Sequence, residues 1–144
     1  MDSRVTLEHA NLSVLDLQGA IDFLTTAFPH FRVRGRGPLA DSPWAGEWVH
    51  LGTDDTYLAL QQARPGSTRD DVPYDDPGIN HVGFVVDDVD ALRGRLLEAG
   101  YREGLVVDPH PHRKRIYFHD PDGTEYEFIE YLSEDPAERN AYPE

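Results

Sequence analysis

The chain of 144 residues contains no cysteine and has few basic residues for its acidic ones. Without cysteine there is no disulfide, no thiolate metal site and no cysteine nucleophile, so His, Asp and Glu are the strong metal ligands that remain. The chain has 13 Lys and Arg residues against 27 Asp and Glu residues, a formal net charge of −14. Nucleic acid and anionic membranes would repel such a chain, and we expect neither as a partner.

Long hydrophobic runs are absent as well. The N-terminal stretch MDSRVTLEHA has no apolar signal core, and no run approaches the roughly 20 apolar residues that a membrane-spanning helix needs. We therefore expect a cytoplasmic protein. Hydrophobic residues make up 39% of the chain and charged residues 28%, which is typical of a globular protein with one domain or two small half-domains.

The chain does contain an internal repeat. LEHANLSVLDLQGAIDFL begins at Leu7, and INHVGFVVDDVDALRGRL begins at Ile79, 72 positions later. This offset places His9 on His81. Each copy reads as a strand followed by an amphipathic helix, with an Asp in position to cap the helix N-terminus.

The later parts of the two copies also match. WVHLGTDDTYLALQQ and IYFHDPDGTEYEFIE each read as a strand, an Asp-rich turn and a second strand, at an offset of 68 that places Ala59 on Glu127. The stretch 64–78, rich in Pro, Gly, Asp and Ser, reads as a linker. The pattern predicts helices over 17–27 and 88–99, and strands over 5–14, 31–35, 46–51, 56–62, 79–86, 101–107, 114–119 and 124–131.

These elements predict an α+β fold of two tandem βαβββ modules in a single domain over residues 1–144. Module one covers about 5–63, and module two covers about 79–132. The polar tail, 133–144, is expected to add one helical turn or a dimer contact. Gly100 follows the second helix as a natural C-cap.

Alternation along the strands places three metal-binding side chains on polar faces. His9 and His81 lie opposite the apolar faces of their strands, and Glu127 lies opposite Tyr126 and Phe128. If the two sheets surround a shared cavity, two imidazoles and one carboxylate form a facial set for a divalent metal with open positions for substrate or water. The alternative is an exposed glutamate on an edge strand and two polar-face histidines.

At these residues the sequence resembles the vicinal oxygen chelate superfamily, which includes glyoxalase I, extradiol dioxygenases, fosfomycin-resistance transferases and bleomycin-resistance proteins. The resemblance covers about Val5 to Leu132, and DPDGTEYEF and INHVGFVVDDVDAL are its most specific pieces. It implies paired modules that form an open, cupped mixed β-barrel with the helices outside.

The family's metal ligands match His9, His81 and Glu127 by position. Glyoxalases carry a fourth ligand, a Glu, where this chain has Ala59, which cannot bind metal; Gln61 lies two residues on, on the same face. The three-ligand pattern is instead similar to that of extradiol dioxygenases and fosfomycin transferases. Glu125 receives no role, and its replacement by alanine is expected to matter little.

The stretch HPHRKRIYFHDPDGTEYE, residues 110–127, resembles the extradiol signature. This resemblance implies that His110 and Tyr117 contact substrate near the metal as catalytic residues; the alternatives are a loop histidine and a structural tyrosine. Extradiol enzymes also place an acid–base His where this chain has Thr56, which cannot do that chemistry near neutral pH. His50 substitutes only if it points into the cavity.

Three functions remain open. The first is a divalent-metal-dependent enzyme acting on a small molecule with vicinal oxygens, most like an extradiol-type dioxygenase or a related lyase or isomerase. Fe(II) or Mn(II) is favoured, and Zn(II) or Ni(II) is possible. The second is a metal-free, drug-binding protein of the bleomycin-resistance type, for which Trp44, Trp48 and Tyr57 supply aromatic surface. The third is a fosfomycin-type thiol transferase that uses the basic run RKR at 113–115. Because many relatives dimerise, a homodimer is expected.

Overall fold

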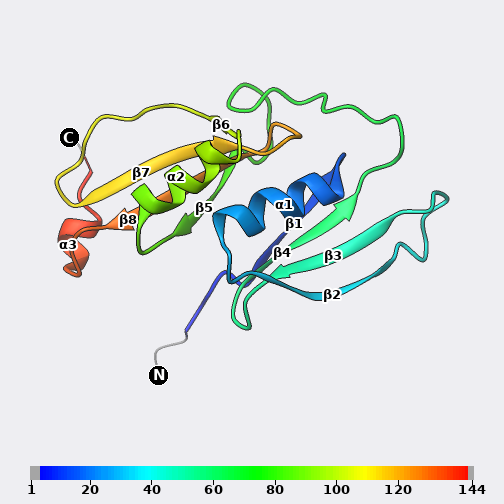
Figure 1. Cartoon of the computed structure of the whole chain (residues 1–144), viewed down its shortest axis with the longest axis horizontal. Helices are drawn as coiled ribbons and strands as arrows, with labels where there is room; N and C mark the ends of the chain where they lie inside the picture. Colours follow the sequence, from blue (N-terminus) through cyan, green and yellow to red (C-terminus); the bar gives the residue numbers. More distant parts are fainter. Residues whose placement is uncertain (1–3, 143–144) are drawn as a thin grey trace. The chain divides into compact units, whose positions relative to one another are not determined.

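The computed structural model describes residues 4–142 and divides the chain into two compact units, with the boundary between Arg69 and Asp70. The boundary lies inside the predicted linker, 64–78. Each unit contains one four-stranded mixed sheet and a helix of ten or eleven residues (Figure 1). No helix within residues 4–142 has the length and hydrophobicity to cross a membrane.

The first unit is a complete βαβββ module. Its sheet has the order β1-β4-β3-β2, in which β1 and β4 are parallel and the other neighbours are antiparallel. The elements are β1 (His9–Val14), α1 (Leu17–Ala27), β2 (Arg32–Pro38), β3 (Glu47–Gly52) and β4 (Tyr57–Gln62).

The second unit repeats this topology, with the strand order β5-β8-β7-β6 and β5 parallel to β8. A short helix follows the last strand and confirms the helical turn that the tail was expected to add. The two βαβββ modules predicted from the sequence are therefore confirmed. The elements are β5 (His81–Val85), α2 (Val89–Glu98), β6 (Arg102–Glu103), β7 (Arg113–His119), β8 (Glu125–Tyr131) and α3 (Pro136–Arg139).

The strand register preserves the repeat residue by residue. His9 pairs with Tyr57 in the first sheet, and His81 pairs with Glu125 in the second. Two residues further along each pair of parallel strands, Ala59 stands opposite Asn11, just as Glu127 stands opposite Gly83. Ala59 is thus the structural counterpart of Glu127, as the sequence offset predicts.

The helices begin and end where their caps place them. Asp16 and Asp88 accept hydrogen bonds from the backbone N–H groups of Gly19 and Ala91, which satisfies free donors in the first turn of each helix. Gly100 follows α2 with a φ of +85°, a left-handed conformation that ends the helix and that glycine adopts at little cost.

One face of each sheet packs under its helix and forms a core. The buried side chains of α1 include Phe23 and Leu24, and those of α2 include Leu92 and Leu96. On the second sheet Phe118, Tyr126 and Phe128 are fully buried on the α2 side. Because strand side chains alternate, the residues between these positions point to the face of the sheet without a helix.

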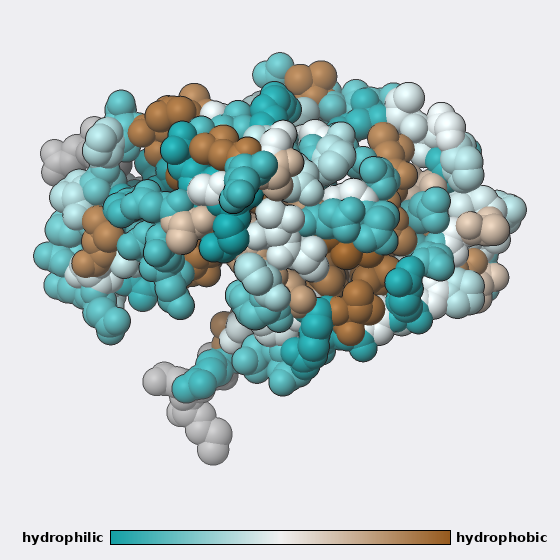
Figure 2. All heavy atoms as spheres, viewed as in Figure 1, coloured by the Kyte–Doolittle hydropathy of each residue, from teal (hydrophilic) through white to brown (hydrophobic). Residues whose placement is uncertain are grey.

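Two predicted strands are shorter by four residues or more in the structure. The strand expected over 101–107 is reduced to β6. The last contact with the sheet is the bond from the Gly104 N–H to the Tyr117 carbonyl oxygen. Beyond it the chain leaves the sheet, and Leu105 and Val106 are exposed. The first strand begins at His9 rather than residue 5, and Val5 and Leu7 are exposed. Hydrophilic residues dominate the visible surface, with hydrophobic ones in separate small groups (Figure 2), as the net charge suggests.

Candidate metal centre

Glu127 lies on the helix-free face of the second sheet with both carboxylate oxygens engaged. It is 9% exposed. The Tyr117 hydroxyl, on the neighbouring strand β7, donates to Glu127 Oε1 at 2.8 Å, and His81 Nε2, on β5, lies 3.0 Å from Glu127 Oε2. Asp120 Oδ1 accepts hydrogen bonds from the N–H groups of Asp122 and Thr124 and so fixes the turn before β8, the strand that carries Glu127. The sequence prediction that Glu127 turns away from the core side chains is met.

His81 is held from its other ring nitrogen by a tyrosine of the linker. The Tyr74 hydroxyl lies 3.0 Å from His81 Nδ1 and donates its proton to Glu125 Oε1, which itself is 3.6 Å from Nδ1. A hydroxyl has a single proton to donate. Since Tyr74 gives that proton to Glu125, it accepts from His81, which places a proton on Nδ1.

This network brings two acceptors together. With its proton on Nδ1, neutral His81 directs the lone pair of Nε2 towards the Glu127 carboxylate oxygen 3.0 Å away. Two acceptors at this distance need a proton shared between them or a metal ion. Gly83 faces this carboxylate, and a β-carbon there would make an ordinary van der Waals contact with Glu127 Oε2 at 3.7 Å.

The backbone of Tyr74 is in an unfavourable conformation at this position. Its φ is +73°, a left-handed conformation that a bulky residue rarely adopts and that costs of order 1 kcal/mol. The Tyr74 N–H donates to Asn80 Oδ1 at 2.6 Å, which fixes the turn. Burial and the hydrogen bond to Glu125 raise the pKa of Tyr74 to about 12, so its hydroxyl stays protonated near neutral pH.

Glu125 is part of the same cluster, contrary to the sequence expectation that it has no role. Besides its contacts with Tyr74 and His81, its Oε2 lies 3.4 Å from His119 Nε2. Its side chain is 11% exposed. The register explains the placement, because residues two apart on β8 share a face and Glu125 stands directly opposite His81.

Tyr117 serves the same carboxylate. Its burial and the hydrogen bond to Glu127 raise the pKa of Tyr117 to about 12. The hydroxyl is therefore a hydrogen-bond donor at neutral pH rather than a base. Tyr117, predicted as a catalytic residue, touches the predicted metal ligand Glu127 directly.

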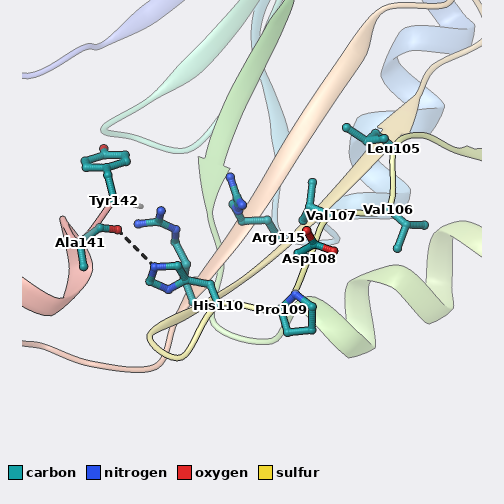
Figure 3. Close-up of a pocket in the computed structure, with 10 residues that line it drawn as sticks. Leu105, Val106, Val107, Asp108, Pro109, His110, Arg115, Ala141 and Tyr142 are labelled. Atoms are coloured by element: carbon teal, nitrogen blue, oxygen red, sulfur yellow. Dashed lines mark hydrogen bonds between the residues drawn. The ribbon is translucent and has the colours of Figure 1, made fainter. Parts of the chain in front are cut away.

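His110, the other predicted catalytic residue, has both ring nitrogens engaged by the backbone. Its Nδ1 accepts from the His112 N–H at 3.1 Å, and its Nε2 lies 3.2 Å from the Ala141 carbonyl oxygen, to which it donates (Figure 3). The bond to Ala141 joins the segment before β7 to the C-terminal tail. His110 lies in the wall of a pocket of the second unit, and Tyr117 is not among the residues that line this pocket.

His9, the third predicted ligand, lies in the first unit on β1. Its Nδ1 is 2.9 Å from Glu8 Oε1, and its ring stacks on Tyr57 with 4.7 Å between ring centroids. His50 also contacts Tyr57, and the register places His50 opposite Ala59 and hence on the face that carries His9. This settles the orientation of His50, which the sequence left open.

Within residues 4–142 no group of three or more His, Cys, Asp or Glu side chains is arranged to hold a metal ion. The structure thus brings His81 and Glu127 together within the second unit, and His9 belongs to the first unit. The pair itself fits a divalent cation by donor type. An imidazole nitrogen and a carboxylate oxygen 3.0 Å apart are donors that would hold such an ion together.

Comparison with known proteins defines the class. The sequence-family model of the Glyoxalase/Bleomycin resistance protein/Dioxygenase superfamily matches residues 6–128. The chain belongs to this superfamily, and the resemblance stated from its motifs is confirmed.

Individual relatives are distant. A glyoxalase family protein from Bacillus cereus superposes with a TM-score of 0.73 at 20% identity, over 92% of this chain and 97% of that one. The fosfomycin resistance protein FosX from Mesorhizobium loti gives 0.66 at 22% identity, over 97% and 100%. FosX from Listeria monocytogenes, complexed with Mn(II) and sulfate, gives 0.68 at 19% identity, over 96% and 100%. At these identities the likeness shows the fold.

In sequence, the Escherichia coli (strain K12) protein YaeR, itself uncharacterized, is 37% identical over 54 residues. The match spans 37% of this chain and 42% of YaeR, less than half of either protein.

Proposed function

We propose that this protein is a divalent-metal-dependent enzyme that acts on a small molecule with vicinal oxygens. The observation that carries the proposal is the approach of His81 Nε2 to Glu127 Oε2 at 3.0 Å, with the Tyr74 hydroxyl 3.0 Å from the other ring nitrogen, Nδ1. A metal ion satisfies both acceptors at once. A hydrogen-bond partner on the opposite ring nitrogen, here Tyr74, is the arrangement that orients metal-binding histidines.

His81 and Glu127 are the two ligands that the second unit supplies, and His9, their match in the first module, is the proposed third. Two imidazoles and one carboxylate suit Fe(II) or Mn(II), with Zn(II) and Ni(II) as further possibilities. The bound ion would supply Lewis acidity to two neighbouring substrate oxygens.

Tyr74, Glu125 and Tyr117 hold the ligands in place. Tyr74 and Glu125 keep the proton of His81 on Nδ1, which leaves Nε2 free to bind. Tyr117 orients the Glu127 carboxylate through Oε1, which leaves Oε2 directed towards His81. Partners of this kind fix the orientation and basicity of metal ligands.

For the reaction, we favour an extradiol-type dioxygenase or a related lyase or isomerase. His50 is the candidate acid–base residue, because it shares a sheet face with His9. Thr56 is unsuited to proton transfer, and its hydroxyl donates to the Glu8 carbonyl oxygen at 3.0 Å. We also propose that the protein is cytoplasmic and forms a homodimer. Light scattering after size-exclusion chromatography tests the homodimer.

The test of the metal centre is the metal content of protein purified anaerobically without a His tag. We expect about one Fe or Mn per chain in the wild type and loss of the ion in His81→Ala, Glu127→Ala and His9→Ala. His30→Ala is the control, because His30 lies outside the strands, in the turn after α1. Equal metal content in all five proteins would refute the ligand assignment. Assays for catechol cleavage, for isomerisation of methylglyoxal hemithioacetal and for fosfomycin modification then separate the reactions.

A second candidate is a metal-free binding protein, and one observation in the first unit favours it. The rings of His9, Tyr57, His50 and Trp48 contact one another in series, at centroid distances of 4.7, 4.7 and 4.8 Å. The Arg34 guanidinium lies 4.2 Å above Tyr57. Such a row can stack a flat aromatic ligand. Ligand binding that is unchanged by chelator, in protein that takes up no divalent ion, would favour this function.

A further inference from the structure

A pocket of about 740 Å³ opens on the second unit beside β7 (Figure 3). The segment between β6 and β7 forms one wall, with Leu105, Val106 and Val107, and the start of β7 and the C-terminal tail form the rest. The volume is in the range of small-molecule sites. Nothing in the metal centre described above accounts for this pocket.

A buried arginine lines it. Arg113 is 7% exposed, and one of its N–H groups donates to the Arg139 carbonyl oxygen at 2.9 Å. Its guanidinium lies 5.2 Å from the centre of the Tyr142 ring. No ion pair between Arg113 and a carboxylate occurs among residues 4–142. An arginine at this burial is ordinarily paired with an anion, and this one has donors to spare.

A second arginine points to the same side. Lys114 turns towards α2, where its Nζ lies 2.7 Å from Asp90 Oδ2. By alternation, Arg113 and Arg115 share the opposite face of β7, and both line the pocket. Asp108 lines it too, so among the described lining residues one carboxylate stands against two guanidinium groups. The surplus positive charge contrasts with the net charge of −14 of the whole chain.

The remaining wall is apolar and exposed. Leu105 is 69% exposed and Val106 is 80% exposed, and Tyr142, on the facing tail, is 75% exposed. Exposed apolar side chains around a pocket favour a ligand that covers them. The lining therefore suits a molecule with an anionic end and an apolar body.

Strand β7 carries both a residue of the pocket wall, Arg115, and a residue of the proposed metal centre, Tyr117. Tyr117 follows Arg115 by two residues on the same face of β7, about 7 Å along the strand, and it holds Glu127. We infer that the protein binds an organic carboxylate with an apolar body, whose carboxylate pairs with Arg113 and Arg115. The planar guanidinium groups match a carboxylate in bidentate geometry. If this acid is the substrate of the enzyme, the inference rests on the proposed function. The binding of the acid itself does not depend on the metal.

The test uses metal-free full-length protein in chelator, with phenylacetate as the probe and NMR chemical shifts as the readout. We expect saturable shifts at the pocket residues, at least about tenfold weaker binding in Arg115→Gln, and unchanged binding in Lys114→Gln. The neutral analogue phenylacetamide should bind at least about tenfold more weakly than the acid. Arg115→Gln is preferred to Arg113→Gln because Arg115 is only partly buried, which keeps the fold intact.

Absence of saturable binding by the wild type, equal binding by Arg115→Gln, or equal binding of acid and amide would each overturn the inference. Tighter binding of phenylphosphonate than of phenylacetate would overturn the carboxylate assignment in favour of a phosphonate. Because chelator is present throughout, failure here leaves the metal-content result untouched. A protein without metal can likewise still bind the acid, so the two proposals fail separately.

Discussion

Replacing Tyr117 by phenylalanine removes one oxygen atom and tests whether the Glu127 carboxylate is held as described. The Tyr117 hydroxyl donates to Glu127 Oε1 at 2.8 Å, and each residue is 9% exposed. A hydrogen bond to a charged group contributes about 1.5–3 kcal/mol. Since water reaches this carboxylate poorly, we expect Tyr117→Phe to lower the free energy of unfolding by about 2 kcal/mol.

The assay is urea denaturation in the presence of chelator, so that metal binding does not contribute. The matched control is Tyr131→Phe on β8, whose ring lies over Arg139 and whose hydroxyl makes no hydrogen bond among the residues described. It should change stability by less than about 0.5 kcal/mol. In a Glu127→Gln background the loss from Tyr117→Phe should shrink, because the acceptor is then neutral. Equal, small losses in Tyr117→Phe and Tyr131→Phe would refute the hydrogen bond.

Three further changes test other parts of the second unit. Glu125→Gln should weaken metal binding at least about tenfold in competition with a chelator, because it disturbs the bond that orients His81; unchanged affinity would contradict that role. Gly123→Ala should cost about 1–2 kcal/mol in thermal unfolding, because φ there is +82°, and no loss would show that the turn adapts. Glu103→Gln should cost up to about 1 kcal/mol at pH 7, because Arg93 holds Glu103 with two hydrogen bonds and lowers the pKa of its carboxyl from the ordinary 4.5. In the wild type this contribution is present above about pH 4.5 and is lost as the pH falls below it, so the two proteins should converge in acid.

Most of the fold could be predicted from the hydrophobic periodicity and the internal repeat of the sequence. The alternation that sets Glu127 opposite its core neighbours is a property of any strand, and the offset of 68 predicts its match with Ala59, which the register bears out. The same alternation could have found Glu125, which lies two residues before Glu127 and therefore on its face. The signal available in the sequence was that two glutamates, which are poor strand formers, lie on one face of a strand.

Tyr74 and the Arg113 pocket could not be found in this way. Tyr74 reaches His81 through a left-handed turn in a linker of low periodicity, and no local pattern encodes such a contact. The pocket arises because the segment after β6 leaves the sheet, whereas its apolar residues at 105–107 read as a strand. In both cases tertiary contacts override the local propensity.

Binding of Mn(II) to the metal-free protein, followed by electron paramagnetic resonance with pulsed detection of nitrogen couplings, tests the central claim most directly. The account predicts one tightly bound ion per chain in the wild type, with couplings to imidazole nitrogen, and no tight binding in His81→Ala or Glu127→Ala. Tight binding that persists in both variants, or an ion without imidazole nitrogen in the wild type, would contradict a metal centre built on His81 and Glu127.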